Sequence, residues 1–184
     1  MENRVCAHYH ANEPFFVRVL LRAMGDTRNT LTLDRFDRRI LEILQADGRI
    51  SNQALAERVN LSPSPCLRRV RALENAGLIV GYRAMVDARA LGYGLTALLL
   101  ISMDAHTPER FSQFEARVAE LPEVRECLLI TGQEADYQLR IAVADMDDYQ
   151  RLLLQHITRI PGVSGVHSSF VLRSVLADRV LPPR

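Results

Sequence analysis

Between residues 33 and 77 the apolar positions repeat every three or four residues, in three short blocks. This period predicts three helices, each with one apolar face. Two aspartates, Asp34 and Asp37, stand near the start of the first block, and Gly48 follows its end. Acidic residues favour a helix start and glycine favours a helix stop. We therefore expect a first helix here that packs behind the next two.

A tight break separates the second block from the third. Ser51 precedes the second block and is a typical helix-capping residue. The chain then breaks at residues 60–62, and the pair Ser62–Pro63 predicts a new helix start. A serine oxygen can accept hydrogen bonds from free amides at a helix start, and proline lacks the amide that would otherwise stay unpaired. Two short helices joined in this way are the layout of a helix-turn-helix DNA reader.

The third block carries its charges on one side. At about 100° per residue, Ser64, Arg68 and Arg71 share the side opposite the apolar residues, and Arg69 lies on the flank. Arginine can bind phosphate oxygens or a guanine edge, and serine hydroxyls and first-turn amides add phosphate contacts. A run of arginines is usually only a solvated helix face, but a capped supporting helix favours DNA reading, because it sets the angle of the reading helix. The expected DNA-binding residues are Ser51, Asn52, Gln53, Ser62, Ser64, Pro65, Arg68, Arg69 and Arg71.

From residue 95 onward, strand-like and helix-like patterns alternate. The predicted elements are a strand at 95–103, a helix opened by Thr107 and Pro108, strands at 124–131 and 137–144, a helix capped by Asp145, and a strand at 163–176. The order βαββαβ predicts a ferredoxin-like domain with two helices on one face of a four-stranded sheet. The uncovered face of such a sheet predicts association between copies.

The sequence therefore predicts an α+β chain with two domains. The β-branched stretch 78–87 is expected to be the strand of a wing. Met24 offers a second start site, which would make the preceding residues an artefact of gene prediction. The expected segments are an extension at 1–32, a winged helix-turn-helix domain at 33–82, a linker at 83–94, an effector and oligomerisation domain at 95–176, and a tail at 177–184.

Charge is distributed unevenly along the 184 residues, although the net charge is only +1. Residues 33–82 carry eight arginines against six acidic residues, or +2, whereas residues 95–176 carry seven arginines against eleven acidic residues, or −4. DNA contact is therefore expected in the first domain and a different task in the second. An apolar content of 48% is enough for both to build cores.

Several classes of site are not supported by the sequence. Three scattered cysteines give neither a disulfide framework nor a paired metal site, which favours a reducing cytoplasm. Cys6, His8 and His10 alternate as metal ligands sometimes do, but this weak pattern does not predict a metal site. No apolar run is long enough to cross a bilayer. No catalytic cluster or phosphate-binding glycine loop occurs, so we expect neither an enzyme nor a required cofactor.

Five sequence pieces carry a resemblance that covers residues 33–176. They are LSPSPCLRRVRALE, GLIVGYRAMVD, LPEVRECLLITG, ADYQLRIAV and IPGV, in that order. Together they resemble the Lrp/AsnC family, the leucine- and asparagine-responsive regulators of bacteria and archaea. The resemblance implies a cytoplasmic transcription regulator that binds double-stranded DNA and responds to an amino acid. It also implies homodimers that assemble into tetramers or octamers.

The resemblance also implies an effector site near the loop that joins the second and third strands of the sheet. Its glycine would let the backbone approach a ligand, and Asp136 could receive an ammonium group. Taken alone, the same residues are typical of a hairpin turn. Three residues separate Gly132 from Asp136, where the family commonly has two, so the loop could bulge, bind a different effector or have lost the response. The expected effector-binding residues are Thr131, Gly132, Asp136, Tyr137 and Gln138.

The sequence leaves two alternatives open. Enzymes that decarboxylate sirohaem intermediates resemble the same two-domain arrangement, but they would need histidines or arginines that face a tetrapyrrole. The exposed position predicted for Arg68, Arg69 and Arg71 favours the regulator. The other alternative is a regulator that wraps DNA as an oligomer without any effector.

Overall fold

The computed structural model describes residues 32–131, 135–176 and 180–183. These residues form two compact units, one made of residues 32–84 with 180–183 and the other of residues 85–131 with 135–176. Each unit has its own hydrophobic core. Residues 1–31 of the extension expected at 1–32 lie outside the described residues, and they include Cys6, His8, His10 and Met24.

The helical unit contains the three expected helices, α2 (Arg35–Ala46), α3 (Asn52–Arg58) and α4 (Pro63–Asn75). Asp34 caps α2 in a capping box with Asp37, and the Ser51 hydroxyl accepts a hydrogen bond of 3.2 Å from the Ala54 amide at the start of α3. The apolar faces meet in a core of Ile40, Ile43, Leu55, Ala56, Val59, Cys66 and Leu73. The three predicted helices and their packing are confirmed.

The break between α3 and α4 lies where the sequence predicted it. Asn60 has φ 55°, a left-handed conformation that asparagine tolerates better than most residues. The predicted start of α4 at Ser62–Pro63 is confirmed, but the predicted cap bond is wrong, because the Ser62 side chain accepts no hydrogen bond from the helix start. Its hydroxyl is exposed instead.

The segment that follows α4 is not a strand. Residues 78–87 contain no strand in the structure, so the predicted wing strand is wrong. A strand needs a partner, and the described part of the helical unit contains no other strand to pair with it. The segment instead folds back on α4, where the Tyr82 hydroxyl donates a hydrogen bond of 3.0 Å to Glu74 Oε1. Partial burial, together with this carboxylate, raises the pKa of Tyr82 to about 12.

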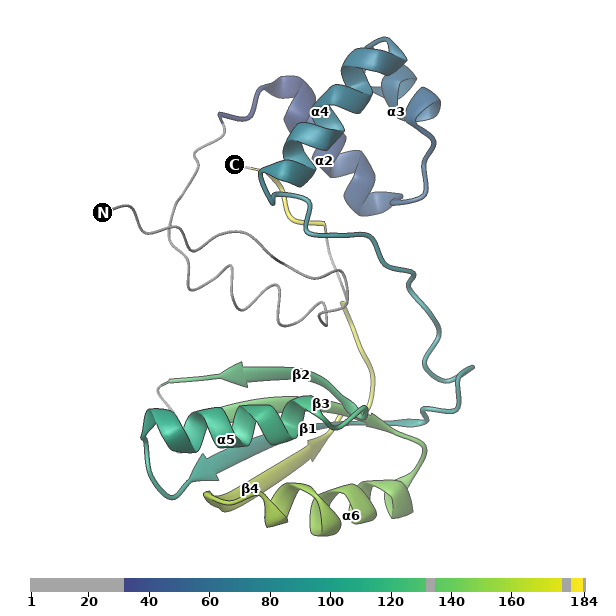
Figure 1. Ribbon diagram of the computed structural model, residues 1–184. Coiled ribbons are helices and arrows are strands. Elements are labelled where there is room, and N and C mark those ends of the chain that lie inside the picture. The colour runs from purple at the N-terminus through teal and green to yellow at the C-terminus, as the bar shows by residue number, and fades with distance from the viewer. Residues whose placement is uncertain (1–31, 132–134, 177–179, 184) are drawn as a thin grey trace, which may run out of the picture. The chain divides into compact units, whose positions relative to one another are not determined.

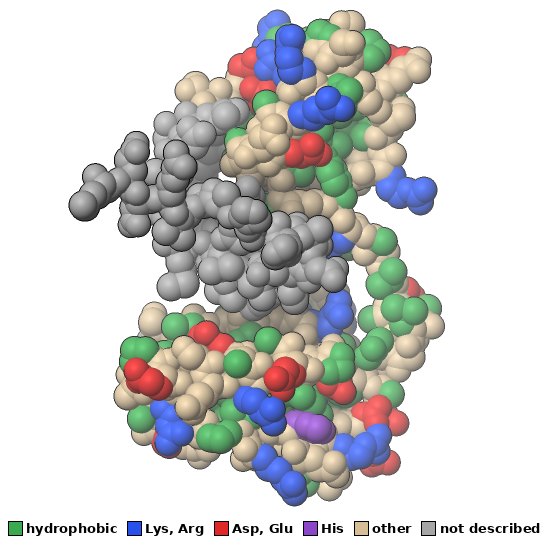
Figure 2. Space-filling view, in the orientation of Figure 1, with side chains coloured by type: hydrophobic (Ala, Val, Ile, Leu, Met, Phe, Trp, Pro, Cys, Tyr) green, Lys and Arg blue, Asp and Glu red, His purple; other side chains and the backbone are tan. Residues whose placement is uncertain are grey.

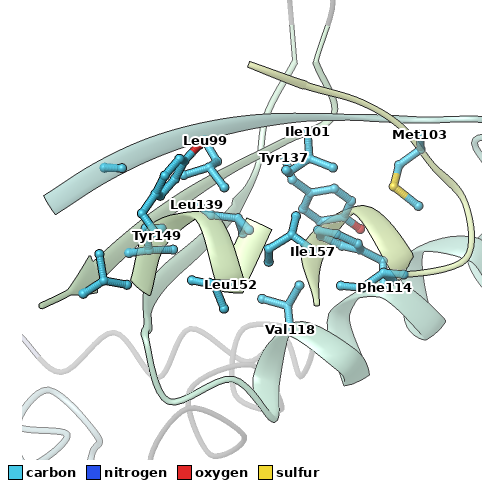
Figure 3. Packing of buried hydrophobic residues seen from close by; sticks show 14 residues of the cluster. Leu99, Ile101, Met103, Phe114, Val118, Tyr137, Leu139, Tyr149, Leu152 and Ile157 are labelled. Carbon is cyan, nitrogen blue, oxygen red and sulfur yellow. The ribbon is translucent and has the colours of Figure 1, made fainter. Parts of the chain in front are cut away.

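The sheet unit has the predicted order βαββαβ, and the pairing of its strands is entirely antiparallel (Figure 1). Its elements are β1 (Leu95–Met103), α5 (Pro108–Ala119), β2 (Val124–Leu129), β3 (Tyr137–Val143), α6 (Met146–Gln155), a short 3₁₀ helix (Ile157–Arg159) and β4 (Val163–Phe170). The strands lie in the order β2-β3-β1-β4, so β3 and β1 are the two central strands and β1 pairs with β3 and β4. Both helices cover one face, where they bury Phe114, Val118, Tyr149 and Leu152 against the strands (Figure 3).

Three strands end earlier than predicted. β4 stops at Phe170 rather than at residue 176, β2 stops at Leu129 rather than at residue 131, and β3 stops at Val143 rather than at residue 144. β4 ends because its partner ends: Phe170 lies opposite Ala97, and Val171 makes a last backbone bond to Thr96 near the start of β1. Beyond that point the apolar sequence continues without a strand to pair with, and Leu172 is 92% exposed.

A glycine fixes the path by which the linker reaches β1. A Cβ atom added to Gly94 would lie 2.7 Å from the Ala144 carbonyl oxygen, which is closer than real Cβ atoms come. Any larger residue at this position would push the linker away from the end of β3.

Candidate functional site

One side of α4 presents charge to solvent. Arg68 and Arg71 are exposed on the same side as Ser64, and neither arginine forms an ion pair or hydrogen bond with another described residue. Figure 2 shows arginine side chains, in blue, standing out from the surface of the helical unit. Several guanidinium donors therefore remain available for an outside acceptor.

The start of α4 adds further free donors to this side. The Ser62 hydroxyl is exposed and does not cap the helix. Pro63 and Pro65 have no amide hydrogen and the Cys66 amide donates to the Ser62 carbonyl oxygen, so the Ser64 amide is the first-turn donor left to attract an anion. Pro65, one turn further on, is half-buried and lies beside these donors. We call the side defined by Ser62, Ser64, Arg68 and Arg71 the reading face.

The residues expected at the start of α3 hold the two helix starts in place. Ser51 uses its hydroxyl to cap α3. Asn52 Nδ2 donates to the Pro63 carbonyl oxygen over 2.8 Å and so ties the start of α3 to the start of α4. Gln53 is exposed, and its amide lies 3.5 Å from Glu57 Oε1. Ser51 and Asn52 therefore position the reading face from behind.

Arg69 is engaged within the protein. Its Nη1 lies 2.8 Å from Asp34 Oδ2 and 2.8 Å from Asp37 Oδ1, and its guanidinium lies 5.3 Å from the Phe36 ring centroid. Its bond to Asp37 is the main cause that raises the pKa of Arg69. The pKa of Asp34 is lowered, first by the amide of Asp37 and then by other donors that include Arg69. Arg69 thus clamps α4 to the start of α2 and stands apart from the reading face.

The loop between β2 and β3 contains the expected effector residues. Gly132 lies outside the described residues, and Thr131 is exposed. Asp136 joins the loop to the sheet, because its amide donates to the Ile101 carbonyl oxygen over 2.8 Å and its carbonyl oxygen accepts from the Ile130 amide over 2.9 Å. Its position is therefore fixed by β1 and by the residue that directly follows β2.

Both carboxylate oxygens of Asp136 already have partners. Oδ2 accepts a hydrogen bond of 2.7 Å from the Met103 amide, and Oδ1 lies 2.6 Å from Nε2 of the exposed His106. An ammonium group would have to share Oδ1 with His106. Sequence spacing could not reveal His106, which is 30 positions away from Asp136. Only the pairing of β1 with β3, which places Ile101 opposite Tyr137, brings the two groups together.

Tyr137 and Gln138 point to opposite faces of the sheet. The Tyr137 side chain is in the core, 1% exposed, with its ring centroid 4.6 Å from that of Phe114 and its hydroxyl donating to Glu115. Its ring therefore supports the loop from the core side. Gln138 is half-buried on the uncovered face, where Leu100 and Leu128 are its cross-strand neighbours.

Other possible sites are limited. A hollow of about 440 Å³ lies at the opposite end of β3, between Tyr93, Val143 and Leu152, and contains none of the expected site residues. Among the described residues, no group of histidine, cysteine and acidic side chains could hold a metal ion. No helix in the described part of the chain is long and apolar enough to span a membrane.

Comparisons with known proteins bear on both units. Residues 33–80 match a model of a winged helix-turn-helix DNA-binding domain, and residues 96–181 match the Lrp/AsnC ligand-binding domain. The chain is 45% identical over 143 residues to the leucine-responsive regulatory protein of Salmonella typhimurium, which covers 78% of this chain and 87% of that protein. The protein of the same name from Escherichia coli K12 is 44% identical with the same coverage.

Solved structures give the same result. A transcriptional regulator from Neisseria meningitidis, in complex with L-methionine, superposes with a TM-score of 0.78 at 38% identity and covers 82% of this chain and 97% of its own. AsnC from Escherichia coli superposes with a TM-score of 0.74 at 26% identity and covers 82% of this chain and 99% of its own.

Proposed function

Since the chain belongs to the Lrp/AsnC family of DNA-binding transcriptional regulators with an amino-acid ligand-binding domain, we propose which of its residues read DNA and which receive the effector. Its relatives are regulators and not enzymes, so the decarboxylase alternative is set aside. We expect such a regulator to work in the cytoplasm, where its DNA is.

DNA is read by the reading face. The observation that carries this proposal is the pair Arg68 and Arg71, exposed on one side of a supported helix and without partners among the described residues. Ser62 and Ser64 supply phosphate contacts at the start of the same helix. Arg69 is assigned to positioning, because its donors are engaged by Asp34 and Asp37. In a dimer, two such faces would meet half-sites about one DNA turn apart or a multiple of it.

The effector is received at the loop from Thr131 to Gln138. A neutral amino acid is the class proposed, and L-methionine and L-leucine are the first probes, because the matched relatives are a methionine complex and leucine-responsive proteins. Its ammonium group would bind Asp136 Oδ1 in place of His106, and backbone amides around Gly132 would bind its carboxylate. Tyr137 would hold the loop from the core side.

Copies associate through the uncovered face of the sheet. Leu98 and Leu100, in the central strand, are only partly buried on this face, and Leu128 in β2 is 43% exposed. An apolar sheet face without a covering layer favours a second copy. We propose a homodimer that assembles further into a tetramer or octamer, which light scattering coupled to gel filtration would measure.

The DNA proposal is tested by binding to DNA just upstream of the protein's own coding sequence, over a salt series. Wild type should bind this DNA more tightly than random DNA and should weaken steeply as salt rises. Arg68→Ala should lose site preference. The matched control Arg117→Ala removes an exposed arginine from α5 and should bind as wild type does. Equal affinity of wild type and Arg68→Ala for the preferred site would overturn the assignment of Arg68.

The effector proposal is tested in the same assay with L-methionine or L-leucine added. A change in DNA affinity or in oligomer size that disappears in Asp136→Asn, while binding without amino acid is retained, would support the site. Specific DNA binding that no amino acid alters would instead support the effector-independent regulator. Failure of this arm leaves the reading face intact, because the two sites lie in different units.

A further inference from the structure

A short segment distant in sequence lies against α2. Gln45 contacts the backbone of Leu181 twice: its Nε2 donates to the Leu181 carbonyl oxygen over 3.0 Å, and its Oε1 accepts from the Leu181 amide over 2.8 Å. Arg38 Nη1 donates to the Pro183 carbonyl oxygen over 3.3 Å. The segment 180–183 accordingly groups with the helical unit rather than with the sheet unit that precedes it along the chain.

The chemistry of the two partners is complementary. A glutamine side chain carries an NH2 donor group and a carbonyl acceptor, and here it uses one of each, which is the pair that a neighbouring strand offers to an extended residue. Prolines at 182 and 183 have no amide hydrogen and hold the segment extended, so it presents mainly carbonyl oxygens. Arg38, which forms no ion pair with a described residue, supplies a donor to one of them.

The two side chains form one surface on α2. They are seven positions apart, which is about two helical turns, so both project from the same side of the helix. An extended segment can lie along that side and reach both. A chance contact on the surface would involve a single side chain. Here Arg38 and Gln45 together bind three backbone groups of a four-residue segment.

We propose that this side of α2 is a docking site for the proline-containing segment 180–183 of the same chain, which acts as a strap on the helical unit. The helical unit is then attached to the rest of the chain at two places, through the linker after residue 82 and through the strap. A displacement of residues 171–176 can therefore be passed to α2 through the strap, without passing through the linker. This inference does not depend on the proposed DNA or effector roles.

The test is amide hydrogen exchange of the full-length protein, followed by NMR. The prolines contribute no amides, so the segment reports through Val180 and Leu181 alone. Leu181 should exchange more slowly than its free-peptide rate, by about fivefold or more given the net strength of such hydrogen bonds. Val180, whose amide donates to no described residue, is the internal reference.

Two matched variants separate docking from general stability. Gln45→Ala should return Leu181 to its free-peptide rate, while the unfolding of the helical unit stays unchanged, because Gln45 is exposed and alanine favours helices. Gln53→Ala removes an exposed glutamine from α3 and should leave Leu181 protected. Unprotected Leu181 in wild type, or protection that survives Gln45→Ala, would overturn the strap.

A mixing experiment decides whether the strap acts within one molecule. Gln45→Ala chains retain an intact segment, and Leu181→Pro chains retain an intact docking side. If the contact forms within one chain, unfolding and refolding the two together should leave Leu181 of the Gln45→Ala chains unprotected. Recovery of its protection would show that the segment docks on a second copy and would overturn the intramolecular strap.

Discussion

Arg68 and Arg69 are neighbours in the sequence and have the same chemistry, yet they lie on two sides of α4 with opposite environments. Arg68, with Arg71, faces solvent and has no partner among the described residues, whereas Arg69 is held by two carboxylates of α2. A helix turns about 100° per residue, and this rotation separates the two roles. A run of arginines is therefore not one functional unit, and the group left free by the protein is the better candidate for an outside ligand.

The largest effect is expected from a substitution in the core beneath α4, because it disturbs the side that carries Arg68 and the side that carries Arg69 together. Leu73 is fully buried, and Leu73→Ala should destabilise the helical unit by about 2–5 kcal/mol. Thiol labelling would locate the effect, because burial raises the pKa of Cys66 in this unit and that of Cys127 in the other. Leu73→Ala should speed labelling of Cys66, and Leu99→Ala should instead speed labelling of Cys127. Equal acceleration of both thiols by Leu73→Ala would contradict the separation into two cores.

The outward side should respond in binding and not in stability. Arg68→Ala should weaken binding to the preferred site by about 1–3 kcal/mol and relax the sequence preference at the contacted base. Its free energy of unfolding should stay within about 0.5 kcal/mol of wild type, because Arg68 is exposed and has no described partner. Parallel DNA titrations and urea unfolding measure the two. If Arg68→Ala lost enough stability to explain its weaker DNA binding, Arg68 would have a structural role like that of Arg69, and the proposed difference between the two arginines would be wrong.

Substitution of Arg69 should lower the stability of the helical unit and leave DNA affinity largely unchanged. Arg69→Ala leaves Asp37, which is largely buried, without its guanidinium partner and should destabilise the helical unit by about 1–2 kcal/mol. Arg69→Lys keeps the charge but cannot reproduce the planar fork, so it should restore only part of the stability. Thermal unfolding would be compared with DNA affinity measured well below the transition. DNA affinity reduced in a fully folded Arg69→Ala protein would place Arg69 with the reading residues after all.

The smallest expected effect is a pH dependence at the same clamp. The folded protein lowers the pKa of Asp34, so the charged form is favoured by folding. This stabilisation is present above the unfolded pKa of about 4 and is lost as the pH falls through the lower folded value. Asp34→Asn, which keeps a good capping residue, should show a flatter loss of thermal stability between pH 6 and pH 3. Parallel curves for the two proteins would argue against the contribution of Asp34.

Sequence reasoning predicted what is decided locally. The helix start near Asp34 and the caps at Ser51 and Asp145 follow from residue type and position, and the bounds of β1 follow from an apolar run with clear ends. The extra length predicted for β4 shows the limit, because an apolar sequence continues past the point where the partner strand ends.

The site was predicted less completely, for the same physical reason. The carboxylates that pair with Arg69 lie 35 and 32 positions upstream, and Asp136 pairs with His106 30 positions before it, so neither pairing leaves a spacing signal in the sequence. The helical period could place Arg69 on a flank, but it could not tell what lies opposite that flank. Likewise, the alternation that puts Tyr137 in a strand does not say which face is covered by helices.

The central position of β1 has a consequence for the order in which a growing chain can fold. The contacts among α2, α3 and α4 are complete once residue 82 has been made, whereas β1 must wait for β3 and then for β4, which ends at residue 170. On the ribosome we therefore expect the helical unit to fold first, while the apolar β1 remains without one of its neighbours until the last strand leaves the exit tunnel. During that interval the open side of β1 is a place where a chaperone or another nascent chain can bind.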